Sequence, residues 1–346
     1  MSREPGASAP RPATRIRRFA LAVLLAPLAG CSLERIAADQ MVPVLQRTRD
    51  LVNQEPVPRA AREAGPGLLV TLEGIVATSP ENVELRLLQA ELAATFAFAF
   101  LEEEDPAWAR ALYRKARGAA LAALAEEEEE LAGALAADRP VGPLLAEADE
   151  DALPALFWWA FARGAEINLD KGDPAKVAGL TRVDEVMGWV LARDERFYHG
   201  GPQLYFAMRR AALAPTFGGD PVKAAEHFDA VDRITGKRFL LPAVLRAKFL
   251  APSLAATPAG AGATEALAAQ QRAWDAYYGG LKAVLAAPDD LFPEQALANA
   301  VAKERARRLL AAPEDNNIIP PPGAVNEFAS PGDEPGDSAG WDDGGD

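Results

Sequence analysis

Proline directly after an aspartate or a serine recurs along the chain, and this pairing strongly restricts the secondary structure of the segment that follows it. In each pair the first side chain can accept backbone N–H groups as a helix N-cap, while proline at the first helical position gives up no hydrogen bond. Each pair therefore predicts the start of a helix. The pairs are Ser79-Pro80, Asp105-Pro106, Asp173-Pro174 and Asp220-Pro221.

The stretch between residues 32 and 312 has the composition and spacing of helices. It is rich in Ala, Leu, Glu and Arg, and it contains no Asn-Gly or Asp-Gly hairpin pair. In residues 221–235, Val222, Ala225 and Phe228 recur at the spacing of one helical face, with charged residues largely opposite. The sequence therefore predicts an all-α fold.

The distances between the predicted helix starts indicate a repeat architecture. Asp105 and Asp173 are 68 residues apart, which is twice the 34-residue period of tetratricopeptide repeats. Asp173 and Asp220 are 47 residues apart, so the array is irregular. We expect residues 31–312 to form a degenerate tetratricopeptide-like stack of antiparallel helix pairs with a free concave face, and a plain helical bundle is the alternative.

The start of the chain has the organisation of a bacterial lipoprotein signal. A basic region ends at Arg18, an apolar run follows, and the chain's single cysteine, Cys31, closes the lipobox-like sequence LAGC. The apolar run is about half the length of the ~20 residues that span a membrane. We expect cleavage after Gly30 and lipidation of Cys31, with residues 1–30 removed; a structural cysteine behind an ordinary signal is the alternative.

The residue after the lipobox bears on which membrane holds the anchor. Ser32 stands where an aspartate would favour retention in the inner membrane, by analogy with enterobacterial sorting. We therefore expect a lipid-anchored protein at the periplasmic face of the outer membrane. Residues 1–30 carry five Arg and one Glu, so their removal moves the formal charge from −14 to about −18. Such acidity argues against nucleic acid as a partner, because phosphate contacts need a basic face.

The end of the chain differs from the middle in composition. Residues 313–346 contain no Lys or Arg, many acidic residues, and repeated Gly and Pro. Such a segment cannot bury enough apolar surface to offset the entropy of ordering it. We interpret residues 313–346 as a disordered acidic tail.

A search for catalytic or metal-binding groups finds no constellation in the sequence. The chain has two histidines, and neither has a cysteine or a second histidine at zinc-ligand spacing. We expect His199, before Gly200-Gly201 at a helix start, to serve in a cap or a turn, and His227 to be exposed on its helix. No serine lies in a G-x-S-x-G elbow. The sequence therefore predicts a non-enzymatic protein without a metal or a cofactor, and a cryptic enzyme is a remote alternative.

Aromatic residues are the best candidates for a binding surface. Trp158 and Trp159 are adjacent, so on a helix they point about 100° apart and cannot both serve one narrow stripe. One should fill the core, and the other should face a neighbouring subunit or a ligand groove, unless both are core residues. The turn containing Phe217, Gly218 and Gly219 is a second candidate for a contact surface, although it lacks the Gly-Lys-Ser/Thr ending of a phosphate loop.

The order of these motifs resembles the T component of TRAP transporter systems, a family of periplasmic tetratricopeptide-like lipoproteins. Each segment alone is weak evidence, whereas the ordered set behind a lipobox is fairly specific. The segments that carry the resemblance are residues 68–117, 153–169, 198–231 and 296–310.

The resemblance implies a role in secondary, ion-driven uptake beside a solute-binding P subunit. It also implies a homo-oligomer, with a trimer as one form, and an internal channel or groove for a small hydrophobic ligand. A hypothesis of another class is a helical-repeat lipoprotein that serves as a scaffold in outer-membrane or envelope assembly. Neighbouring genes for a P protein and the membrane TRAP subunits would favour the transport hypothesis.

Overall fold

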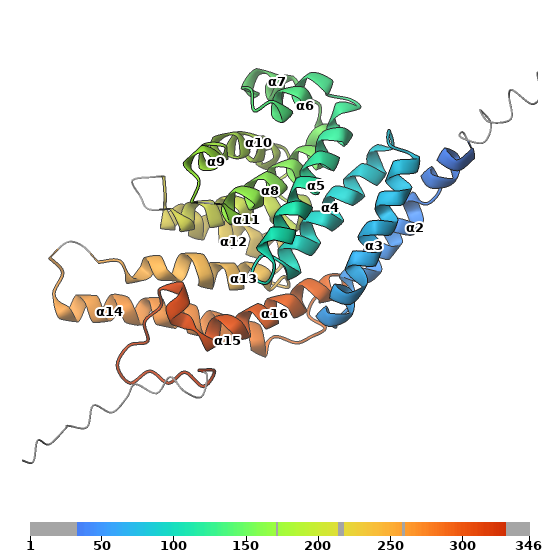
Figure 1. Cartoon of the computed structure of the whole chain (residues 1–346). Helices are drawn as coiled ribbons and strands as arrows, with labels where there is room; N and C mark the ends of the chain where they lie inside the picture. Colours follow the sequence, from blue (N-terminus) through green and yellow to red (C-terminus); the bar gives the residue numbers. More distant parts are fainter. Residues whose placement is uncertain (1–32, 171, 214–217, 258–259, 330–346) are drawn as a thin grey trace, which may run out of the picture.

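The computed structural model describes residues 33–329, except residues 171, 214–217 and 258–259 (Figure 1). The predicted signal peptide with Gly30 and Cys31, the aromatic residue Phe217, and the tail from residue 330 onward all lie outside the described residues. The described part confirms the all-α fold, because it contains helices and no strand. None of its helices has both the length and the apolar character needed to cross a membrane.

A short helical segment at residues 33–39 precedes the labelled helices. The first half of the stack consists of α2 (Val42–Asn53), α3 (Pro58–Thr78), α4 (Val83–Phe100), α5 (Pro106–Ala125), α6 (Glu129–Ala136), α7 (Gly142–Glu147) and α8 (Leu153–Leu169). The second half consists of α9 (Pro174–Ala178), α10 (Leu180–Arg193), α11 (Phe197–Ala212), α12 (Pro221–Thr235), α13 (Leu241–Leu245), α14 (Ala263–Trp274), α15 (Gly280–Ala286) and α16 (Ala296–Ala311).

The aspartate N-caps fall where the sequence predicts them. Asp105 accepts the N–H of Trp108 at the start of α5, and Asp173 and Asp220 cap α9 and α12 in the same way. The prediction for Ser79 is wrong. It ends α3, its hydroxyl donates to Asp39, and α4 begins four residues later behind the cap Asn82. An asparagine is an equally good N-cap, so the sequence offered two candidate starts and the structure uses the second.

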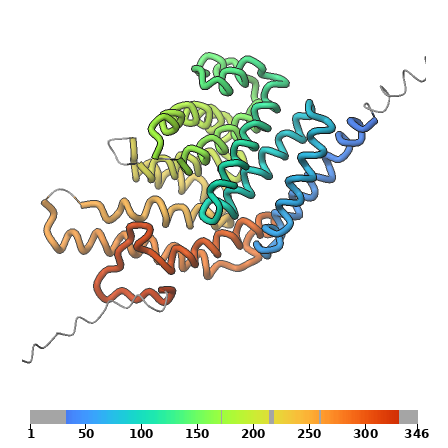
Figure 2. The backbone as a smooth tube through the Cα atoms, viewed as in Figure 1, coloured from blue at the N-terminus to red at the C-terminus, as the bar shows by residue number. Residues whose placement is uncertain are grey.

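Many consecutive helices pack side by side, such as α4 with α5 and α11 with α12, and α8 packs against both α5 and α10 (Figures 1 and 2). Helix α4 lies against α3, α5 and α8, which explains why its residues are apolar on nearly all sides. The largest apolar cluster extends from α3 to α10, and a separate cluster joins α13 to α16. A small cluster at α11, α12 and α13 lies between them.

Polar side chains connect the carboxyl end of the stack back to its first half. The Arg305 guanidinium on α16 is almost fully buried, donates to the carbonyl oxygen of Phe98, and lies 4.4 Å from the Phe98 ring centre. Lys248 and Arg308 both pair with Glu103, at 3.2 and 3.3 Å. We call the contacts of Arg305, Lys248 and Arg308 with residues 98–103 the clasp.

Residues 313–329 differ from the expected disordered tail, because they pack on the helical domain. Ile318 is fully buried against α14–α16, and Phe328 contacts the same cluster. Gln270 donates to two backbone carbonyls of this segment, and Lys282 pairs with Glu327 at 2.7 Å. The prediction of disorder used the average composition of residues 313–346. That average does not reveal the few apolar residues that anchor residues 313–329.

A left-handed run interrupts α11 near its start. Tyr198, His199 and Gly200 have φ values of +46°, +60° and +82°, which cost side-chain-bearing residues about 1–2 kcal/mol each. The expected turn at His199 is therefore confirmed. Gly201 then lies so close to the Phe157 ring that a Cβ there would be 2.7 Å from it. The run changes the chain direction and positions Tyr198 and His199 beside a cavity.

Candidate functional site

A cavity of about 610 Å³ lies where α2, α4, α8 and the start of α11 meet. Residues from well-separated parts of the sequence line it, so the fold alone creates the site. The apolar part comes from α4 and the aromatic residues, and the polar part comes mainly from α2. The lining residues are Gln46, Arg49, Asp50, Asn53, Glu84, Leu87, Leu88, Glu91, Pro154, Trp158, Phe197, Tyr198, His199 and Gln295.

The aromatic part of the wall is held rigidly. The Tyr198 ring stands edge-on to Trp158, with ring centres 4.7 Å apart, and Phe157 packs behind both. His199 packs against Phe239 and Phe292, each at 5.7 Å from its ring centre, and these two rings also contact each other. Aromatic packing of this kind can hold the strained backbone of the left-handed run in place.

A charged pair lies on the polar side of the cavity. The Arg49 guanidinium contacts the Glu91 carboxylate at 3.3 Å and the Asp50 carboxylate at 2.8 Å. Glu91 is buried on α4, within a run that is otherwise largely apolar. A buried carboxylate needs a partner, and the Arg49–Glu91 pair provides it.

Burial sets the protonation of this network. Burial raises the pKa of the Glu91 carboxyl, and the charge of Arg49 and the neighbouring Tyr198 hydroxyl only partly oppose that shift. Burial and the nearby Glu91 raise the pKa of Tyr198 well above its ordinary value, so its hydroxyl stays protonated. Burial lowers the pKa of Arg49, but Glu91 and Asp50 outweigh it and the net shift is upward. The site therefore combines Arg49, already paired with Glu91 and Asp50, with a protonated Tyr198 hydroxyl and an apolar wall.

Trp158 and Trp159 are both buried, each with 2% of its surface exposed. Trp158 contributes to the cavity wall, whereas Trp159 lies in the largest apolar cluster and does not line the cavity. Neither indole faces outward from the stack, so both occupy the core and only Trp158 is positioned to touch a ligand.

The structure does not bring the glycine turn to this cavity. Gly218 has φ +89° and its carbonyl accepts from Arg210, near the far end of α11. From Gly201, after the left-handed run, to Arg210 the helix advances nine residues, which corresponds to about 14 Å. Gly218 and Gly219 connect α11 to α12 and allow Asp220 to cap α12.

His227 is half-buried, so the expectation of an exposed side chain is wrong. Its ring stacks on Phe206, with centres 5.7 Å apart, and its Nδ1 lies 2.6 Å from the Gln203 oxygen. Burial lowers the pKa of His227, with a smaller contribution from Arg210. Helical spacing placed it on the charged side of α12, but α11 covers that side.

Sequence reasoning missed Arg49, Glu91 and Tyr198 as members of one site. One signal was available: Glu91 interrupts the apolar run of α4, and a charge in such a helix must find a partner. The identity of the partner depends on tertiary packing, because 42 residues separate Arg49 from Glu91. Within the described ranges, no group of three or more His, Cys, Asp or Glu side chains is arranged to hold a metal ion.

The fold and the cavity define a class of protein: an all-helical stack with an amphipathic cavity between helices of its described part. A family model described as TRAP transporter T-component matches residues 54–316, which is most of the chain. The chain therefore belongs to the TRAP transporter T-component family, as its motifs predicted. A search of curated proteins found no match.

Proposed function

We propose that this chain is a lipid-anchored, non-enzymatic component of a TRAP-type uptake system at the periplasmic face of the outer membrane. It binds the solute-binding P subunit, assembles into a homo-oligomer and accepts a small, largely hydrophobic ligand in the cavity lined by Trp158 and Tyr198. The family match over residues 54–316 is the observation that carries this proposal. The cavity supports the ligand part, because its volume and apolar wall are typical of small-molecule sites.

Binding of the P subunit is the central test of the proposal. Purified mature protein mixed with the P subunit encoded nearby should form a complex measurable by calorimetry or co-elution, with and without ligand. The preformed surface of a helical stack lowers the ordering cost of association. No complex at tens of micromolar, together with an unrelated gene neighbourhood, would favour the envelope-scaffold hypothesis instead.

A bulky residue in the cavity should prevent ligand binding. Leu87 lines the cavity from α4 and is half-buried, so Leu87→Trp should occupy space that a ligand needs. Native mass spectrometry of the purified parent chain should detect a co-purified small molecule that Leu87→Trp lacks. The matched control, Val222→Trp, changes a residue that is 70% exposed on α12 and should retain the ligand. Equal ligand content in both variants would place the ligand elsewhere.

Lipidation is tested at Cys31. The variant Cys31→Ser should accumulate as an uncleaved precursor or appear in the soluble fraction, because it lacks the thiol that receives the lipid. Membrane fractionation and intact mass would measure both effects. A Cys31→Ser protein that still fractionates with membranes at the mature mass would contradict the anchor.

A further inference from the structure

Exposed apolar side chains are concentrated at the amino-terminal end of the described chain. Of fourteen large apolar residues that the described part exposes, seven lie between residues 33 and 70. Leu33 is 68% exposed, Ile36 56% and Val44 54%. Concentrated exposure of this kind marks a surface that is covered in the working protein.

Helical spacing places these residues on one side of each helix. In the segment 33–39, Leu33 and Ile36 lie opposite the buried Ala38. On α2, Val44 and Leu51 lie one above the other, away from the buried Leu45. We call Leu33, Ile36, Met41, Val44 and Leu51 the amino-terminal apolar face.

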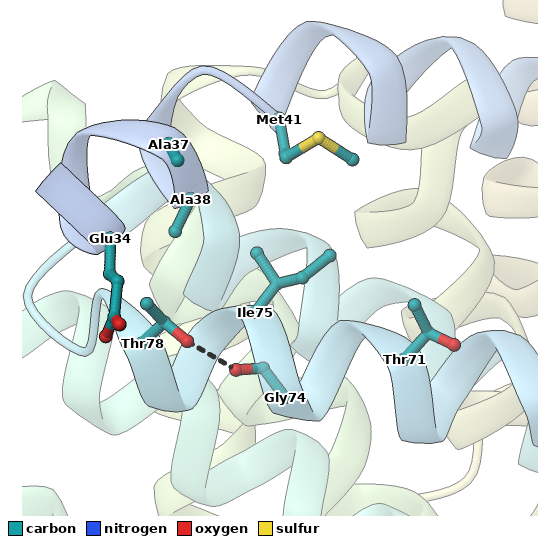
Figure 3. Close-up of a pocket in the computed structure, with 8 residues that line it drawn as sticks. All are labelled: Glu34, Ala37, Ala38, Met41, Thr71, Gly74, Ile75 and Thr78. Atoms are coloured by element: carbon teal, nitrogen blue, oxygen red, sulfur yellow. Dashed lines mark hydrogen bonds between the residues drawn. The ribbon is translucent and has the colours of Figure 1, made fainter.

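A shallow groove of about 550 Å³ lies on the other side of the segment 33–39, between Ala38 and α3 (Figure 3). Small and apolar residues line most of it, with Glu34 at one end. A Cβ added at Gly74, on the α3 side, would meet no atom within 4 Å. The groove shares only Met41 with the amino-terminal apolar face.

The position of the face in the chain indicates what covers it. Cys31 precedes Leu33 by two residues, and two residues span at most about 7 Å. A lipid on Cys31 would thus hold Leu33 at the level of the lipid headgroups. Arg47 is exposed between Val44 and Leu51, and a cation on a long stem suits the phosphate layer.

We propose that the amino-terminal apolar face lies on the membrane, so that the helical segment 33–39 and α2 sink into the headgroup boundary of the bilayer. Helices with one apolar side bind in this way, burying that side about 5–10 Å deep. The inference rests on the proposed lipidation of Cys31 and adds a second membrane contact to it. The anchored protein then has one defined orientation, with its first helices on the bilayer.

Site-specific labelling of the mature lipoprotein tests this contact. Cys31 is the only cysteine, so once it is lipidated a new cysteine is the single reactive thiol. A polarity-sensitive dye would be placed at Ile36→Cys, at Val44→Cys and, as a control, at Val222→Cys on α12. The proteins would be reconstituted into vesicles of phosphatidylethanolamine and phosphatidylglycerol, with and without a lipid that carries a quenching spin label.

The expected result is a blue shift and a loss of emission by the spin-labelled lipid at Ile36→Cys and Val44→Cys, with neither effect at Val222→Cys. Water-like, unquenched emission at all three positions would overturn the proposal. A blue shift that increases with protein concentration, without quenching by the spin-labelled lipid, would also overturn the proposal. In that case a second copy of the chain would cover the amino-terminal apolar face. The unsubstituted chain should not react with the dye; if it does, the lipid anchor itself is contradicted.

Discussion

Replacing Trp159 with alanine should lower the free energy of unfolding by about 3–5 kcal/mol, the range for large aromatic residues removed from a core. Its side chain is 2% exposed and belongs to the largest apolar cluster, between α3 and α10. Denaturant unfolding monitored by circular dichroism would measure the change.

The matched control for Trp159→Ala is Val222→Ala, at a side chain that is 70% exposed. This change should stay within about 0.5 kcal/mol. A Trp159→Ala protein as stable as the control would show that the indole contributes little to the core. That result would reopen its use at a contact surface.

Replacing Arg305 with methionine should cost about 3–5 kcal/mol, because one partner of a buried charged cluster is then removed. Arg305 is 9% exposed, and its charge acts on Glu102, which is half-buried and accepts a hydrogen bond from the Tyr113 hydroxyl at 2.7 Å. Without Arg305, the Glu102 carboxylate would lose the positive charge that most lowers its pKa. The double variant Arg305→Met, Glu102→Gln should recover a large share of the loss, and strictly additive effects would contradict the coupling.

The pH dependence provides a second readout of the same cluster. Burial raises the pKa of Glu102 above its ordinary value of 4.5, against the lowering effects of Tyr113 and Arg305. Between the two pKa values the folded chain binds more protons than the unfolded chain, so stability declines as the pH rises through that window. Glu102→Gln should flatten this decline, leaving the part due to Glu91, whose pKa is also raised by burial. An unchanged slope in urea titrations at several pH values would contradict the assignment.

Local sequence patterns predicted the helices well. The side-chain partners that depend on tertiary packing could not be predicted from the sequence. Asp105, Asp173 and Asp220 cap helices through contacts two or three residues away, which a sequence displays directly. Glu91, which pairs with Arg49, and Trp158, which packs on Tyr198, lie on helices distant from them in the chain. Only the glycines after His199 indicated a left-handed run at Tyr198. The conformational energy of that run is offset by aromatic packing between distant helices, which no local sequence pattern contains.

The difference between local and tertiary signals also explains two wrong predictions, the start of α4 and the disorder of residues 313–329. Ser79 and Asn82 are both good caps three residues apart, so local chemistry could not choose between them. The ordering of residues 313–329 depends on a few side chains, such as Ile318 and Phe328, that meet apolar partners on α14–α16. A composition average treats such anchors as part of their polar surroundings.

The clasp bears on how cooperatively the molecule unfolds. The described helices form successive apolar clusters, and a linear array of this kind can open from either end because each unit depends only on its neighbours. Contacts between residues 98–103 and Arg305, Lys248 and Arg308 join distant parts of the array, so opening one end also breaks contacts in the other half. Exposed ion pairs weaken as salt rises. Raised ionic strength should therefore weaken the pairs of Lys248 and Arg308 with Glu103 and broaden the denaturation curve, while the buried Arg305 contact persists.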